Sequence, residues 1–211
     1  MENNVLDAKN TPVKHFAVFL FALAMVLAFR FLLNTSWSTS FGRASFFLLF
    51  LILIIGPVVK IRKPSVNPSP MSAPWTWRGE LGIWFAIASL AHFIIILIDR
   101  PFSSLIRIGG SGYSLTNLLG LVALIWTLAL AAASFRKIII FLGIDSWKWL
   151  NTSTYVIFYL VSFHFIYFQF FSTHGAGPDW FGYSALLAAI LVIILQLSAF
   201  TAVLRRKATA I

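Results

Sequence analysis

The sequence predicts an all-α integral membrane protein, built as a six-helix bundle with both termini in the cytoplasm. Three observations support this prediction. Of the 211 residues, 60% are hydrophobic and 10% are charged, whereas about a quarter of the residues in a soluble domain are charged. The apolar residues gather into six stretches, each long enough to cross a hydrocarbon core of about 30 Å. The Lys and Arg residues between these stretches are concentrated on one side of the membrane.

The six predicted spans occupy nearly the whole chain. They cover residues 15–33, 41–59, 79–98, 115–135, 151–171 and 185–204, within a membrane domain that extends from 15 to 205. Residues 1–14 are polar and lack the apolar core and cleavage site of a signal peptide, so we expect a retained cytoplasmic tail. Residues 206–211 form the second tail. The Pro- and Ser-rich loop before span three lies outside the bilayer, and residues 138–150 are expected at the interface.

The orientation follows from the basic residues. Of the 16 Lys and Arg residues, twelve lie in the tails, in the loop between spans two and three, and around the loop between spans four and five. The remaining four are Arg30, Arg43, Arg100 and Arg107. Cytoplasmic loops carry the excess of Lys and Arg, so this bias places both termini inside.

The composition also excludes several functions. There is no Cys, which excludes disulfides, thiolate catalysis, iron–sulfur clusters and Cys-ligated zinc. The six acidic residues are scattered at span ends and in loops, so a hard-oxygen metal site is not expected. The net charge of +10 comes from basic residues beside hydrophobic spans, where they set orientation, and it does not predict a nucleic-acid partner.

The glycine-rich residues 109–112 follow no predicted strand and precede no Gly-Lys-Ser sequence, so they do not predict a phosphate loop. Membrane lipid is the expected environment.

Two histidines lie well inside predicted spans. His92 is fourteen residues past Arg78, and His164 is sixteen past Lys148. At a rise of about 1.5 Å per residue these separations are about 21 and 24 Å, so both histidines lie at similar depth in the outer half of the bilayer. Neutral imidazoles at one level on facing helices, with an apolar pocket between them, are what coordination of a b-type heme requires. The alternative for each histidine is a hydrogen bond to a neighbouring helix. His15, at the inner mouth of span one, and His174, in an outer loop, are not expected to be ligands.

Arginines at the outer ends of the spans are candidates to bind the heme propionates. Arg43 begins span two and Arg100 ends span three, and the planar fork of Arg binds carboxylates bidentately. Arg30 and Arg107 are better explained by snorkelling at helix ends. Four outer aromatic residues are expected in the interfacial belt: Trp37, Tyr113, Trp180 and Tyr183.

Short motifs in spans two, three and five keep fixed spacings. Span two contains Gly42-Arg43 followed by an apolar run to Pro57. Arg78 precedes span three, which contains Leu81-Gly82 and a Leu-x-His pattern that ends at His92. Span five contains Leu150-Asn151, Tyr155 and His164. Over roughly residues 41–170 these spacings resemble the ferric reductase-like transmembrane domain family. Within it, the sequence is most similar to the heme-binding membrane subunits of bacterial methionine sulfoxide reductase systems.

The resemblance implies a heme protein of the bacterial inner membrane. The family has a Leu-His pair where this chain has Leu150-Asn151, so the inner of two hemes would lose an axial ligand here. We therefore expect one heme b, held by His92 and His164. The expected function is electron transfer, from quinol or from a separate flavin partner carrying FMN, to an acceptor or redox partner protein at the outer face. The alternative is a heme-free assembly or structural subunit that keeps the fold. An absorption spectrum distinguishes the two.

Overall fold

The computed structural model describes residues 12–61, 77–105, 113–171 and 177–208, and all its regular elements are helical. Six helices are long and apolar enough to span a membrane, which confirms the predicted fold class. Backbone groups in lipid have no water to bond, so helices, which satisfy their hydrogen bonds internally, are the expected form for these apolar segments. Many large apolar side chains lie on the outer surface, as lipid contact requires.

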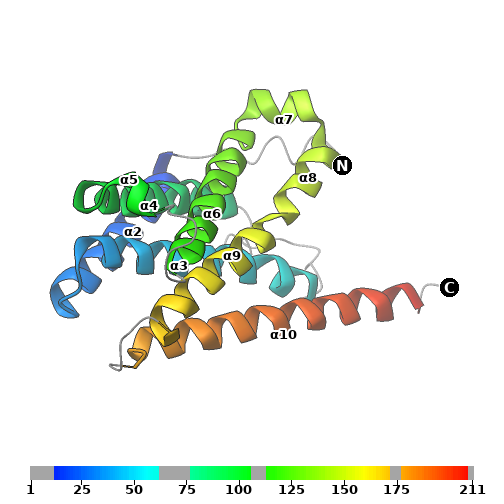
Figure 1. The fold of residues 1–211 in the computed structure, drawn as a ribbon. Helices are drawn as coiled ribbons and strands as arrows, with labels where there is room; N and C mark the ends of the chain where they lie inside the picture. The colour runs from blue at the N-terminus through cyan, green and yellow to red at the C-terminus, as the bar shows by residue number, and fades with distance from the viewer. Residues whose placement is uncertain (1–11, 62–76, 106–112, 172–176, 209–211) are drawn as a thin grey trace.

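The first three spans come from the first half of the chain (Figure 1). The first is α2 (Pro12–Leu27), extended by the π-helical turn η1 (Ala28–Leu32). The second is α3 (Trp37–Ile61), which contains Pro57. The third is α4 (Arg78–Asp99), followed by the short helix α5 (Phe102–Leu105).

The second half supplies the other three spans. The fourth span lies in α6 (Tyr113–Ala133), and α7 (Arg136–Leu142) forms the elbow that follows it (Figure 1). The fifth consists of α8 (Ile144–Thr152), α9 (Thr154–Ile166) and the π-helical turn η4 (Tyr167–Phe171). The sixth is α10 (Trp180–Ala208).

The largest differences from the predicted boundaries lie at three places. The second span begins four residues earlier than predicted, and the sixth begins five residues earlier. The fifth candidate span starts at Ile144, so part of the predicted interfacial segment is continuous with it. Gly143 separates α7 from α8 with φ 77°, a conformation that glycine adopts without strain. Hydropathy alone does not locate such ends, because polar residues cap helices as readily as they form loops.

The helix α3 is the centre of the bundle. It packs against α2, α4, α9 and α10, and α6 packs against α4 and α9. Leu48 and Leu49 of α3 meet Ile157 and Phe158 of α9 in a core from which solvent is excluded. This packing leaves α3, α4, α6 and α9 to enclose one internal space.

Candidate functional site

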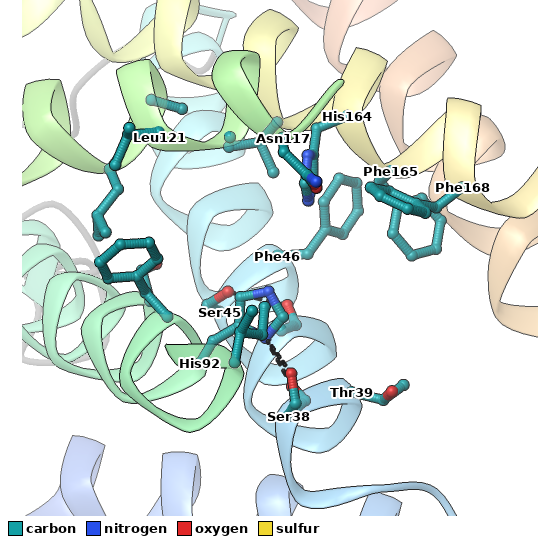
Figure 2. Close-up of a pocket in the computed structure, with 18 of the residues that line it drawn as sticks. Ser38, Thr39, Ser45, Phe46, His92, Asn117, Leu121, His164, Phe165 and Phe168 are labelled. Atoms are coloured by element: carbon teal, nitrogen blue, oxygen red, sulfur yellow. Dashed lines mark hydrogen bonds between the residues drawn. The ribbon is translucent and has the colours of Figure 1, made fainter. Parts of the chain in front are cut away.

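A cavity of ≈ 490 Å³ lies between α3, α4, α6 and α9, and both His92 and His164 line it. Figure 2 shows the two imidazoles in its wall, His92 from α4 and His164 from α9. Phe46, Phe165 and Phe168 contribute aromatic surface to the same space. The volume falls within the range of about 300–1,000 Å³ that is typical of ligand pockets. The predicted matched depth thus corresponds to a shared cavity.

His92 is bound to the backbone of the neighbouring helix. Its Nδ1 atom lies 2.7 Å from the carbonyl oxygen of Ser38 in α3 and 3.1 Å from the Ser38 hydroxyl. A carbonyl oxygen only accepts hydrogen bonds, so Nδ1 carries the proton and donates it. In a neutral imidazole the other nitrogen, Nε2, then has a free lone pair.

His164 repeats this arrangement on the other pair of helices. Its Nδ1 atom lies 2.7 Å from the carbonyl oxygen of Thr116 in α6. The same reasoning assigns the proton to Nδ1 and leaves Nε2 as an acceptor. The hydrogen bond to a neighbouring helix, the alternative to a ligand role, is therefore present at both histidines. It does not compete with ligation, because metal-ligating histidines commonly donate their other N–H to a backbone carbonyl.

A glycine makes each of these contacts possible. Gly42 lies four residues after Ser38, and Gly120 lies four residues after Thr116. A Cβ atom on Gly42 would lie 3.1 Å from His92 Cε1 and Nδ1, and one on Gly120 would lie 2.8 Å from the same atoms of His164. In a helix, residue i+4 covers the face above the carbonyl of residue i. A side chain there would push each imidazole away from its acceptor.

The two histidines can supply two nitrogen ligands to a metal. Among the described residues, no three His, Asp or Glu side chains gather into a metal site. A metal bound by protein side chains alone needs more ligands than two, whereas the iron of a heme needs only axial ones. Two imidazoles with free Nε2 atoms in a largely aromatic and aliphatic cavity therefore fit a heme better than a bare ion.

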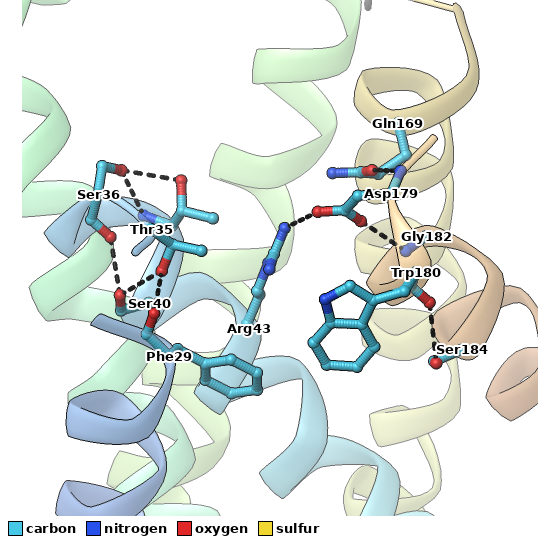
Figure 3. A network of polar contacts seen from close by, with 11 residues as sticks. Phe29, Thr35, Ser36, Ser40, Arg43, Gln169, Asp179, Trp180, Gly182 and Ser184 are labelled. Carbon is cyan, nitrogen blue, oxygen red and sulfur yellow. Dashed lines mark hydrogen bonds and ion pairs between the residues drawn. The ribbon is translucent and has the colours of Figure 1, made fainter. Parts of the chain in front are cut away.

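Arg43 also reaches this cavity, and an acidic residue from the last loop holds it. Its Nη2 donates to the carboxylate of Asp179 (Figure 3). Its guanidinium carbon lies 4.9 Å from the ring centre of Phe181. The Arg43 side chain is 6% exposed, and its Nε is buried with no hydrogen-bond partner. One N–H group of Arg43, a residue that lines the cavity, therefore lacks an acceptor.

The same acidic residue joins the ends of the fifth and sixth spans. The Asp179 backbone N–H donates to Gln169 Oε1 at 3.3 Å, and its carboxylate accepts from the Gly182 N–H at 3.0 Å. We call Arg43, Gln169, Asp179 and Gly182 the outer network (Figure 3). Sequence reasoning did not find it, because an Asp in a polar loop carries no signal of its partner.

The remaining predicted residues lie in different places. Arg100 lines the cavity and is exposed. Arg30 donates to the Thr35 carbonyl at 3.1 Å, as expected for a helix-end residue. His15 lies in α2 and is not among the cavity-lining residues. His174 and Arg107 are outside the described residues.

Asn151 is not part of the cavity either. Its side-chain amide donates to the Trp147 carbonyl at 2.9 Å, within α8. The Asn151 side chain therefore makes a contact within its own helix. The family that this sequence resembles has a histidine at this position.

No protein-family model matches this sequence, and no curated protein matches it.

Proposed function

We propose that this protein is a membrane electron carrier that binds one heme b between His92 and His164. The observation that supports the proposal most is the pair of imidazoles in one cavity, each with Nδ1 bound to a carbonyl and Nε2 left free. When bound, a heme supplies an iron that accepts and releases one electron at a time. His92 and His164 would hold the iron through two nitrogens, and the protein would supply the apolar walls and the charges at the rim.

The backbone hydrogen bonds fix how the ligands are presented. Ser38 and Thr116 hold each imidazole in one tautomer and one orientation before any metal binds. Preorganised ligands lose less rotational freedom on binding, and hydrogen-bond partners of metal-ligating histidines typically change metal affinity by about 10–100-fold. The carbonyls cannot be removed by substitution. The hydrogen bonds can instead be tested by substituting Gly42 and Gly120, which leave room for them.

The arginines of the cavity are suited to bind the propionates. Arg43 has a buried N–H group without an acceptor, and Arg100 lines the exposed side of the same cavity. Both lie at the predicted outer end of the bundle. We propose that the electron acceptor, or a redox partner protein, binds at this outer face of the bacterial inner membrane. The proposed electron donor is a quinol or a separate FMN protein.

An absorption spectrum of the purified protein tests the proposal. A reduced-minus-oxidised difference with b-type bands is expected, and pyridine hemochrome should approach one heme per chain because Asn151 offers no ligand to a second. A heme-free protein from heme-replete cells would instead favour a structural or assembly subunit. A ratio of two hemes per chain would contradict the inference that Asn151 leaves a second heme without a ligand.

Histidine variants test the axial pair. His92→Ala and His164→Ala should each lose the low-spin spectrum, and the double variant should be little worse than either, because the two ligands act as a unit. His15→Ala and His174→Ala are the matched controls, and they should leave the spectrum unchanged. A full low-spin spectrum in His92→Ala would disprove the assignment.

A further inference from the structure

A second polar cluster lies at the opposite end of the bundle from Arg43 and Arg100. It joins four helices through Gly56 of α3, Arg78 of α4, Tyr155 of α9 and Gln196 of α10, and we call it the inner cluster. A Cβ atom on Gly56 would lie 3.8 Å from Tyr155 Oη and 3.9 Å from Arg78 Nη1, so both groups lie against the same point of α3. The Gln196 side chain lies next to Tyr155.

The inner cluster holds a positive charge without a carboxylate. Among the described residues, the ion pairs are those of Arg43 with Asp179 and of Lys148 with Asp145. Glu80 lies only two residues after Arg78, but that spacing places it about 200° around the helix, and neither of its carboxylate oxygens has a hydrogen-bond partner. Arg78 is partly buried, so its charge is only partly solvated.

The cluster also contains a donor without an acceptor. Gln196 Nε2 is buried and makes no hydrogen bond. An amide N–H on α10 and a guanidinium on α4 therefore belong to helices that both pack against α3, and each has donor capacity that no described acidic side chain meets. Nearby basic residues add to the positive potential: Lys60 lies one turn after Gly56, and Arg206 of α10 donates to the Ile61 carbonyl at 3.0 Å. Such a site favours an anion.

We propose that the inner cluster binds a phosphate group, with Arg78 as the principal contact and Gln196 as a second donor. Arg binds phosphate through paired N–H groups, and basic pockets between spans at the cytoplasmic side are suited to anionic lipid headgroups. The ligand class is a phosphate of a lipid headgroup or a free phosphate anion. The proposal goes beyond electron transfer and does not depend on a bound heme.

Thermal unfolding in vesicles separates the two sources. The wild-type protein is reconstituted in phosphatidylcholine, and the unfolding midpoint is followed on addition of phosphatidylglycerol or, separately, of inorganic phosphate against chloride at equal ionic strength. A ligand that binds only the folded state raises the midpoint in a saturable way. A rise with phosphatidylglycerol alone identifies a lipid headgroup, and a rise with inorganic phosphate identifies the free anion.

Variants test the named residues. Arg78→Gln should weaken the apparent affinity about tenfold or more, because it removes charge-assisted hydrogen bonds. Gln196→Leu should weaken it less, and it keeps the test valid if Arg78→Gln fails to fold. Lys148→Gln is the control, since it removes a basic residue outside the cluster, and it should respond like the wild type.

Two results would overturn the proposal. One is the absence of any saturable rise in the wild type with either probe. The other is an equal response of the wild type, Arg78→Gln and Gln196→Leu, which would mean that the anion binds elsewhere.

Discussion

At the scale of single residues, the cavity depends on two glycines as much as on two histidines. Gly42 and Gly120 expose the carbonyls that Nδ1 of each histidine binds. The glycines carry no polar group, so a search for functional side chains passes over them. Their contribution is the space that a missing Cβ leaves.

Gly120→Ala is expected to lower the free energy of unfolding in detergent by about 1–3 kcal/mol, as overpacking in a close-packed interior does. The new Cβ would lie 2.8 Å from His164 ring atoms, so the ring must move away from the Thr116 carbonyl. Gly82→Ala is the matched control, because nothing lies within 4 Å of its added Cβ. Its stability should be unchanged or slightly raised, since Ala favours a helix. An equal loss in both variants would contradict the contact argument.

Glu80 makes a separate prediction. The residue is fully buried in α4, and neither carboxylate oxygen has a hydrogen-bond partner. Buried polar groups without partners typically destabilise a fold by about 1–3 kcal/mol. Glu80→Leu should therefore unfold at a higher temperature than the wild type in the same detergent. A clear decrease would reveal a partner for the carboxylate in the folded protein.

The sequence was informative about part of the site. Depth along the spans predicted that His92 and His164 lie level, and the structure brings both to one cavity; their ligation of a heme stays a prediction. The acceptors could not be found in the same way, because every residue has a carbonyl and only packing decides which one is exposed. Arg43 was named for its charge, but its bond to Asp179 depends on how the last loop returns to the bundle.

At the scale of elements, the outer network fixes η4 and the start of α10 to α3. Arg43 is almost fully buried, while Asp179 is 39% exposed. Removing the carboxylate would leave a buried guanidinium without its counter-charge. That penalty is larger for a buried pair than for a surface pair.

Asp179→Asn should therefore lower the free energy of unfolding by about 2 kcal/mol, a value reduced from that of a fully buried pair because Asp179 is partly solvated. Asp145→Asn is the control: it breaks an exposed pair with Lys148 in the first turn of α8, and no measurable loss is expected. Chemical unfolding in mixed micelles measures both. If the two variants lost equal stability, the ion pair with Arg43 would not be structural.

The number of spans was predictable because long apolar runs are the strongest signal in a membrane sequence. The finer structure was not. Span five is broken at Ser153 between α8 and α9, and the π-helical turns η1 and η4 end two of the spans. These features depend on backbone hydrogen bonds between specific turns, which hydropathy does not register.

At the scale of the whole molecule, the asymmetry of charge predicts the topology. Reporter fusions at Pro68 and at the C-terminus should behave as cytoplasmic, and a fusion at Ala176 as external, because the basic loops remain inside. Moving basic residues into the loop between spans five and six is the control, since it should weaken the bias. An external C-terminus in the unmodified protein would reverse the assignment of inner and outer faces.

The distribution of the cavity along the chain has a consequence for biogenesis. His92 and its acceptor Ser38 are made before α6, whereas Thr116 and His164 are made after α4. Because translation proceeds from the N-terminus, His92 and its hydrogen-bond acceptor are synthesised well before His164. A nascent chain that stops after α6 therefore contains only one of the two histidines that line the cavity. A heme bound as proposed would therefore load only after α9 is in place, and an intermediate stalled before α9 would carry no heme.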